Sequence, residues 1–393
     1  MYLKHRYQLG YESLCREVGD SISWRRFARI PLDQPVPHPT TLSKLVGRAG
    51  PEVIDQLNTA LLGKLAGDKL LRGRKLRVDT TVVEADIDYP TDADLLEQAV
   101  RKVGGLVRRI KGRGAANKTA FRDRSRAAGR RLKQLAHSLR RRGGQAMAEV
   151  DRLTGEVAGI ARQTMRQVQA VARNAHRALG RHPGDGRLAR LVGELTETIG
   201  HTGRLLEQTE QRLAGNRVIP DRLVSLADPD ARPIRKGKPQ HPTQFGYTAL
   251  LAEEERGFIA DYQLQQGNPP DAPQLVPAVK RVAGVTGRVA GTVVADRGFG
   301  TAANDRDLAE LGVARVGLQR RGRLSPTRAE AERTRAFRRM RNWRVGIEAR
   351  ISHLKRGFGL RRTRMRRLPG ARTWVGLGVF AYNLQRMTVV AAR

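Results

Sequence analysis

The chain has 393 residues, enough for roughly two to three domains of ordinary size. Its 74 Lys and Arg side chains outnumber 38 Asp and Glu, and the net charge of +36 favours a polyanionic partner, nucleic acid before an anionic membrane. No run of about 20 apolar residues and no secretory leader is seen. The single cysteine, Cys15, excludes an intramolecular disulfide and a cysteine-based zinc cluster. We therefore expect a cytoplasmic protein.

Residues 1–72 contain short apolar stretches separated by prolines. Helices are predicted at Tyr11–Val18, at Thr40–Arg48 and from Pro51 to about Ala66. Pro51 suits the first turn of a helix because its missing N–H would have no intrahelical partner there. A compact helical domain of this size suits DNA binding, and a helical cap on the next domain is the alternative that the sequence leaves open.

Residues 73–93 are dominated by β-branched side chains between Lys75 and Tyr89, which predicts a strand entering a core. Asp79 lies inside this strand. Pro90 ends it, and Thr91 is a suitable N-cap for the helix that follows. Three later acidic residues lie at odd separations from Asp79 and would face the opposite side of a regular strand: Glu84, Asp86 and Asp88.

Residues 94–227 have the apolar spacing of long helices and predict a coiled-coil-like helical insertion. Glycines at Gly180–Gly186 break the pattern, so the last two long helices are expected to pair antiparallel, and Gly112–Asn117 marks another break. The outward faces are rich in Arg and either lie along DNA or are simply solvated. The predicted seam comprises Leu96, Val100, Val103, Val107, Ile110, Val150, Leu153, Val157, Ile160, Leu188, Leu191, Leu195, Leu205 and Leu213.

Residues 228–393 return to an α/β pattern. A strand pair is predicted at Phe245–Leu251 and Gly257–Gln263, with Glu253, Glu254 and Glu255 in the turn. Further along, the pattern predicts a buried strand at Gly291–Asp296, a helix at Asn304–Leu311, a strand at Ala314–Leu318, one long helix at about Arg328–Arg356 and a final helix at Ala371–Met387.

Three carboxylates have the placement that metal-dependent phosphodiester chemistry requires. Asp79 lies in the β-branched strand, Asp296 closes a buried strand, and Glu348 lies on the long basic helix. Two hard cations about 3.5–4 Å apart can activate the attacking oxygen and stabilise the leaving one, and magnesium prefers carboxylate oxygens and water. Each acid alone is typical of a cap, a turn or a surface ion pair. Together they predict a site for two Mg²⁺ ions, for which Mn²⁺ can substitute.

Around Glu348 the sequence resembles insertion-sequence transposases of the DDE class, in the group with a Tyr-Arg-Glu-Lys signature. Arg344, Glu348 and Lys355 fall on the Arg-x₃-Glu-x₆-Lys part of that signature, while Arg341 stands where the family often has Tyr. The segments YQLGYESL, DPDARPIRKGKPQHPTQFGYTALL and AYNLQRM resemble the same family. The likeness covers nearly the whole chain apart from the helical insertion.

The resemblance implies a ribonuclease-H-like catalytic core formed by residues 73–93 and 228–393 and interrupted by the insertion at 94–227. It implies metal-dependent DNA cleavage and strand transfer at element ends and target DNA, by a homodimer on DNA in a bacterial cytoplasm at the nucleoid. No phosphate-binding loop occurs, so no nucleotide cofactor is expected. The expected DNA contacts are Arg297, Arg344, Lys355, Arg356, Arg361 and Arg362.

Two alternatives remain open at this stage. One is a nuclease of the same fold that cuts without joining. The other is a non-catalytic DNA-binding remnant, because relatives often carry more sequence before the YQLGYESL segment, which here begins at Tyr7. Among the aromatic residues near the acids, Trp343 and Phe299 are expected to pack in the core, with stacking on an unpaired base as the second possibility.

Overall fold

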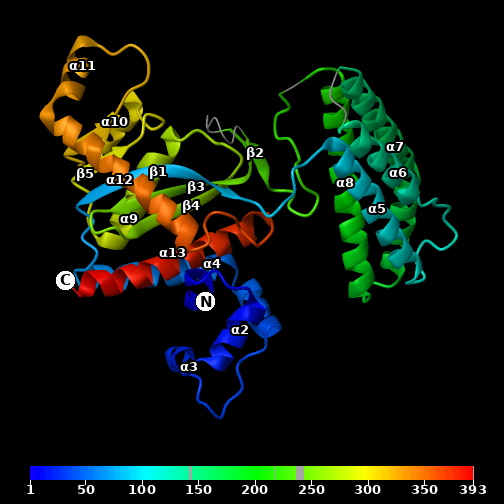
Figure 1. Ribbon diagram of the computed structural model, residues 1–393, viewed down its shortest axis with the longest axis horizontal. Coiled ribbons are helices and arrows are strands. Elements are labelled where there is room, and N and C mark those ends of the chain that lie inside the picture. Colours follow the sequence, from blue (N-terminus) through cyan, green and yellow to red (C-terminus); the bar gives the residue numbers. More distant parts are fainter. Residues whose placement is uncertain (141–143, 217, 236–242, 393) are drawn as a thin grey trace. The chain divides into compact units, whose positions relative to one another are not determined.

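The computed structural model describes residues 1–140, 144–216, 218–235 and 243–392. It divides into two compact units (Figure 1): Met1–Asp86 with Pro233–Arg393, and Ile87–Arg232. The first is the larger unit and the second the helical unit. In the described part of the chain, no helix has the length and apolar character needed to cross a membrane.

The larger unit is built on a mixed sheet with β1 at its centre. Strand β3 pairs antiparallel with β1, and β4 pairs antiparallel with β3, whereas β5 and β6 continue the other side of β1 as parallel neighbours. The short strand β2 borders β3. The strands are β1 (Lys75–Glu84), β2 (Arg232–Ile234), β3 (Gln244–Glu254), β4 (Ile259–Gln266), β5 (Thr292–Ala295) and β6 (Arg315–Leu318).

One face of the sheet is covered by α9 (Leu275–Thr286) and α10 (Ala302–Glu310), which complete an apolar core. Leu76 and Val78 of β1 point into this core. Because side chains alternate along a strand, Arg77 and Asp79 point to the opposite face. There α12 (Arg335–Gly357) contacts β1, β5 and β6, and it lies across the sheet in Figure 1.

The N-terminal segment is helical and packs on the long C-terminal helix α13 (Arg367–Ala391). The two helices predicted at Thr40–Arg48 and Pro51–Ala66 form one element, α4, with a sharp kink. At the kink Gly50 has φ 65°, a left-handed conformation that glycine adopts without a steric penalty, and Pro51 follows. The N-terminal helices are α1 (Tyr2–Arg6), α2 (Tyr11–Asp20), α3 (Ile22–Ala28) and α4 (Pro39–Gly67).

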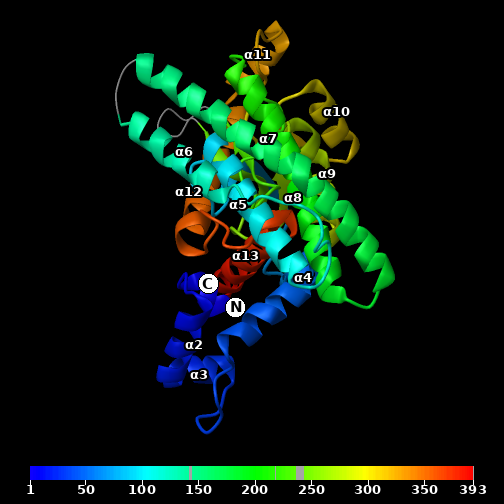
Figure 2. The same ribbon diagram turned by 90° about the vertical axis from the view of Figure 1, so that its right-hand side faces the viewer.

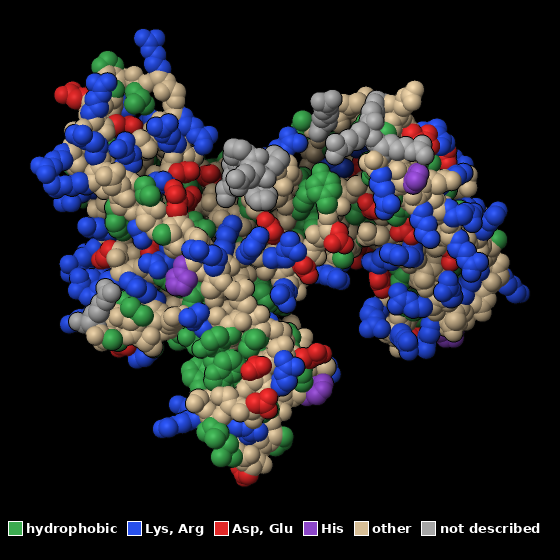
Figure 3. Space-filling view, viewed as in Figure 1, with side chains coloured by type: hydrophobic (Ala, Val, Ile, Leu, Met, Phe, Trp, Pro, Cys, Tyr) green, Lys and Arg blue, Asp and Glu red, His purple; other side chains and the backbone are tan. Residues whose placement is uncertain are grey.

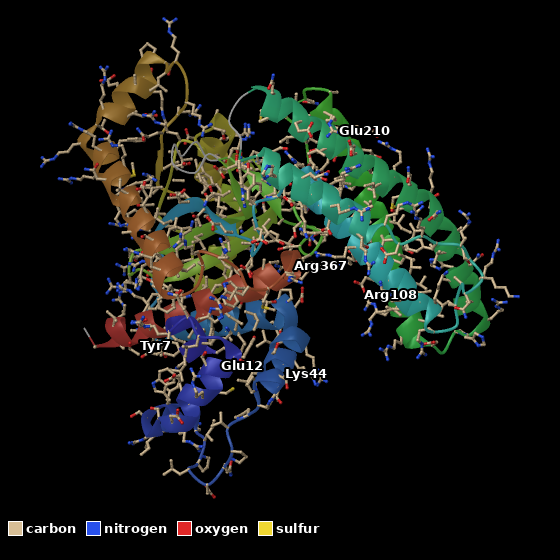
Figure 4. All side chains as sticks on the ribbon, turned by 45° about the vertical axis from the view of Figure 1, so that its right-hand side comes forward. Tyr7, Glu12, Lys44, Arg108, Glu210 and Arg367 are labelled. Carbon is tan, nitrogen blue, oxygen red and sulfur yellow. The ribbon has the colours of Figure 1, made fainter. Side chains whose placement is uncertain are left out.

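The described part of the helical unit contains four helices, and they pack against one another as Figure 2 shows. Their apolar stripes form the unit's own clusters. Most of the predicted seam residues are buried, whereas Val150 and Ile160 are partly buried and Leu213 is exposed. Charged side chains cover the outside, as Arg108 and Glu210 show in Figure 4. The helices are α5 (Asp92–Lys111), α6 (Ser125–Ser138), α7 (Gly144–Arg181) and α8 (Gly186–Leu213).

Two local predictions were wrong. Glu253 and Glu254 are not in a turn: β3 runs through both of them, and both are fully buried. The long helix predicted from Arg328 is two helices, α11 (Pro326–Arg333) and α12. They separate at Thr334, whose hydroxyl accepts a hydrogen bond from the Phe337 amide and so begins α12 anew. The segment DPDARPIRKGKPQHPTQFGYTALL, which resembles the transposase family, spans residues 228–251. Its residues 236–242 lie outside the described residues.

Candidate active site

Strand register places Asp79 beside Asp296. In the parallel pairing of β1 with β5, Val78 is the partner of Ala295. Asp79 and Asp296 are the next residues along each chain, and adjacent strands run about 4.8 Å apart. Asp296 therefore follows the carboxyl end of β5 and lies beside Asp79, which is in the middle of β1. Asp79 points to the sheet face covered by α12, and its side chain is only 14% exposed.

Arg344 on α12 joins Asp79 to Glu348. One terminal nitrogen of its guanidinium lies 3.7 Å from Asp79 Oδ2, and the other donates to Glu348 Oε1 at 2.8 Å. Arg344 and Glu348, four residues apart on α12, thus form an i, i+4 ion pair, and Arg344 also contacts Asp79 of the sheet. The Arg344 side chain is 18% exposed and that of Glu348 60% exposed, so Glu348 sits at the solvent side of the group.

The loop after Asp296 gathers a fourth carboxylate. Asp296 Oδ1 accepts a hydrogen bond from the Gly298 amide at 2.7 Å. A Cβ atom at position 298 would lie 2.8 Å from Asp271 Oδ2 and 2.9 Å from Asp296 Oδ1, so both acids crowd this glycine. Asp271 Oδ1 also accepts from the Thr80 hydroxyl at 3.0 Å, which connects the loop before α9 to β1.

A buried ion network fixes α12 against the sheet. Glu253 of β3 is fully buried and accepts two hydrogen bonds from Arg77 of β1, at 2.7 and 2.8 Å. Its Oε1 also accepts from Arg350 of α12 at 2.8 Å. Arg77 in turn donates to the carbonyl of Trp343 at 2.8 Å and lies over the Trp343 ring. The network spans residues 343–350 of α12 and so sets the position of Glu348 relative to β1.

Gly346 makes this network possible. A Cβ atom at position 346 would lie only 2.1 Å from a terminal nitrogen of Arg77. Contacts below 3.0 Å cannot be tolerated without displacement, so the arginine passes directly over the bare backbone of α12. The helix can therefore approach β1 closely enough for Arg344 to reach Asp79.

Two family models match the chain. A transposase DDE domain matches residues 201–384, and a transposase domain (DUF772) matches residues 1–48. Together these ranges span more than half of the chain. The chain belongs to the DDE transposase family of insertion sequences. No curated protein and no solved structure matches it significantly.

The DDE match covers eight of the nine predicted site residues. Asp79 lies outside residues 201–384, and the others lie inside: Asp296, Arg297, Arg344, Glu348, Lys355, Arg356, Arg361 and Arg362. Asp79 is connected to the others by the structure instead, through the β1–β5 register and the contact with Arg344. Earlier residues of the DDE match, from 201 to Arg232, belong to the helical unit.

Basic side chains surround this region of the transposase. Arg297, Arg356, Arg361 and Arg362 are exposed, and Lys355 is half-buried. Arg362 lies 3.6 Å from Glu84 and 3.5 Å from Asp86, so these two acids neutralise part of the positive charge of this region. Figure 3 shows Lys and Arg side chains spread over this face of the larger unit, with a compact group of Asp and Glu among them.

The aromatic residues near the acids have structural partners. Phe299 is completely buried in the apolar core under the sheet, as expected. Trp343 is half-buried and lies beneath the Arg77 guanidinium. His353 contacts the rings of Phe358 and Tyr382 edge-on.

The donor set suits divalent cations in kind and in backbone position, but its side chains point to other partners. Among the described residues, no three Asp, Glu, His or Cys side chains converge as cation ligands do. Asp79 and Glu348 both contact Arg344, and Asp296 accepts from Gly298. The three carboxylates are therefore held by an arginine and a backbone amide and not by one another.

Sequence reasoning missed the residues that support the site. Asp271 follows two prolines and reads as a turn residue, and no pattern connects it to Thr80 or Asp296. Glu253 was assigned to a turn because it begins a run of three glutamates. One signal for its burial was present: Glu253 directly follows the apolar run 249–252. A carboxylate that continues a buried strand needs a buried partner, which predicts an ion pair.

Proposed function

We propose that this transposase binds the ends of an insertion element, cleaves the DNA there and joins the freed 3′ ends to target DNA, with Asp79, Asp296 and Glu348 as its catalytic carboxylates. The observation that carries the proposal is the position of these acids. Two occupy neighbouring register positions of β1 and β5, and the third is tied to the first through Arg344. The mixed sheet is consistent with a ribonuclease-H-like core made of residues 73–93 and 228–393.

The carboxylates would hold two Mg²⁺ ions, with Mn²⁺ as a substitute. Such a pair supplies activation of the attacking water or 3′-hydroxyl and stabilisation of the leaving oxygen. Asp79 and Asp296 are the ligands held most rigidly, because each is positioned by a strand. Glu348 is the more exposed acid and lies on the side from which DNA approaches.

Arg344 has a second partner in this proposal. Its planar guanidinium contacts two carboxylates, and it donates equally well to phosphate oxygens in a two-pronged geometry. We infer that Arg344 exchanges these carboxylates for a DNA phosphate when substrate binds. Lys355, Arg297, Arg356, Arg361 and Arg362 contribute further phosphate contacts that position the backbone without reading sequence.

The parts of the chain outside the catalytic core, and a second copy of the chain, also have roles in this proposal. Residues 1–72 form a helical DNA-binding region, residues 94–227 form a helical insertion with a basic outer face, and two copies of the chain act together on paired ends. These assignments are supported by the transposase matches at residues 1–48 and 201–384 and by the excess of Lys and Arg.

The test is a set of single substitutions, Asp79→Asn, Asp296→Asn and Glu348→Gln, assayed for Mg²⁺-dependent cleavage of duplexes carrying the element ends. We expect each variant to lose at least about a hundredfold in cleavage rate while its affinity for the same duplex stays within about twofold. Glu310→Gln is the matched control, since this carboxylate is exposed on α10. Cleavage by the three variants at the parental rate would contradict the proposal. Pre-cut ends in the same assay separate a transposase, which joins them, from a nuclease, which does not.

A further inference from the structure

A second basic site lies in the larger unit, away from the carboxylates. A cavity of about 540 Å³ opens to solvent between α1, the segment after α12 and the start of α13. This volume is more than a single phosphate group needs. Its lining residues are Lys4, His5, Gln8, Asp86, Gly359, Arg361, Arg362, Arg364 and Trp374.

Positive charge dominates the lining. Lys4, Arg361, Arg362 and Arg364 supply four cations against the carboxylate of Asp86. Asp86 is paired with Arg362. The other cations of the lining, Lys4, Arg361 and Arg364, have no carboxylate opposite them within the cavity lining. Burial, together with the nearby charge of Arg364, lowers the pKa of Lys4 to about 8. A bound anion would favour the charged form of Lys4, against the effects of burial and of the Arg364 charge.

Two of the lining side chains, Lys4 and Trp374, are held in place by contacts with neighbouring residues. Lys4 is buried, donates to the carbonyl of Leu9 at 2.8 Å, and lies over the rings of Tyr11 and Trp374. Trp374 is itself fixed by a hydrogen bond to the carbonyl of Gly359 at 2.8 Å. Lys4 and Trp374 are therefore preorganised, whereas Arg361, Arg362 and Arg364 are exposed at the rim of the cavity.

A second observation, separate from the charge of the lining, also indicates a ligand: an unpaired nitrogen of the His5 ring. It is 2% exposed, and its ring packs on Trp374 with Nδ1 3.4 Å from the carbonyl of Phe358. Its Nε2 is buried with no hydrogen-bond partner among the described residues. A buried ring nitrogen without a partner costs free energy unless a bound group satisfies it. A bound phosphate is such a group when its negative charge protonates the ring, because the imidazolium donates from Nδ1 to the Phe358 carbonyl and from Nε2 to a phosphate oxygen.

The cavity is connected to the catalytic strand. The amide of Glu84, the last residue of β1, donates to the carbonyl of Arg361 at 3.1 Å, and the Thr363 amide donates back to Glu84 at 2.8 Å. Glu84 lies five residues beyond Asp79, roughly 17 Å along the strand. That distance corresponds to about five steps of a DNA strand.

We propose that this cavity, lined by Lys4, His5 and Arg364, binds a phosphate group of the DNA whose cleavage site lies at the carboxylates. The proposal rests on the proposed function in one respect, that the ligand is DNA. The phosphate is either an internal phosphodiester or a terminal 5′-phosphate, since both offer the same oxygen acceptors. Its binding fixes the position of the DNA strand relative to Asp79.

The experiment follows the ¹⁵N resonance of His5 Nε2 in the full-length protein, in EDTA so that no cleavage occurs. Three probes are added in turn: inorganic phosphate, a short 5′-phosphorylated oligonucleotide, and the same oligonucleotide with a 5′-hydroxyl. A shift with both oligonucleotides supports an internal phosphodiester, and a shift with the phosphorylated one alone supports a terminal phosphate. No shift with either oligonucleotide overturns the proposal, whatever inorganic phosphate does.

Substitution of Arg364 tests the same site without disturbing the core, because this side chain is exposed. Arg364→Gln should weaken oligonucleotide binding at this site about tenfold, as expected for loss of one charge-assisted hydrogen bond. Arg288→Gln removes an equal charge from an exposed position outside the cavity and should have an effect of less than twofold. Equal effects of the two substitutions would overturn the proposal. The readout does not involve Asp79, Asp296 or Glu348, so it stands or fails separately from the cleavage assay.

Discussion

At the scale of single residues, His5 shows how burial changes the chemistry of a side chain. Burial first, and then the charge of Lys4, lower the pKa of His5 from 6.5 to about 3. The folded protein therefore keeps His5 neutral at a pH where an unfolded chain would protonate it. Between pH 6.5 and 3 the unfolded state binds more protons, so the free energy of unfolding falls as the pH falls.

We predict that the contribution of His5 to the free energy of unfolding is about 3 kcal/mol lower at about pH 4.5 than at about pH 7.5. Glu254 acts in the opposite direction over much of this range, because burial and the charge of Glu255 raise its pKa to about 7 and its protonation favours the folded state. A comparison of the wild type with His5→Gln cancels the contribution of Glu254. The measurement is denaturant unfolding of both proteins at several pH values, and parallel stability curves would show that His5 does not titrate as stated.

At the scale of elements, the site depends on how closely α12 approaches β1. Gly346 allows Arg77 to cross the helix, and Arg77 with Arg350 neutralises the buried Glu253. We predict that Gly346→Ala destabilises the larger unit by about 1–3 kcal/mol, because the new methyl group must displace Arg77 from its partners. Cleavage should fall as well, since Glu348 shares this helix.

Gly63→Ala is the matched control for that substitution. Gly63 lies in α4, and no atom lies within 4 Å of a Cβ at that position. Replacing it should stabilise the protein by up to about 1 kcal/mol, since alanine has the higher helix propensity. Thermal unfolding of the two variants gives the test: opposite signs are expected, and stabilisation by both would show that Arg77 can move aside at no cost.

The same elements show what the sequence could reveal and what it could not. Asp79 and Asp296 could be identified because β-branched runs predict their strands, and Arg344 with Glu348 because helical periodicity brings residues four apart together. Burial of Glu253 could not be seen, because its partners lie 176 and 97 residues away in the chain. Local patterns report the periodicity of one element, whereas ion networks depend on which elements meet.

At the scale of the whole molecule, the net charge of +36 governs DNA affinity. Each phosphate neutralised on duplex DNA contributes about −0.9 to the slope of log K against log salt concentration. The six proposed DNA contacts therefore predict a slope of about −5. Fluorescence anisotropy with a labelled duplex over a series of KCl concentrations measures it. Arg361→Gln should make the slope less negative by about 0.9, and Arg288→Gln should leave it unchanged; equal slopes for all three proteins would contradict this assignment.

The chain leaves the sheet and returns to it at one place. Glu84 pairs with Gly246 across β1 and β3, and the Ala85 amide donates to the Phe245 carbonyl at 2.9 Å. Two antiparallel strands in this position can be joined by a two-residue turn. The helical unit has apolar clusters of its own, formed by residues within Ile87–Arg232.

We therefore predict that replacing residues 86–244 by Asn-Gly leaves a chain that folds, because the turn closes β1 and β3 in their existing register. Circular dichroism and a single cooperative thermal transition are the measurements. The control carries Val-Val in place of Asn-Gly, because β-branched residues do not readily adopt the positive φ values that this turn requires. We expect this chain to unfold at a lower temperature or not to fold at all. Equal behaviour of the two proteins would mean that the two-residue turn does not close β1 and β3 as stated.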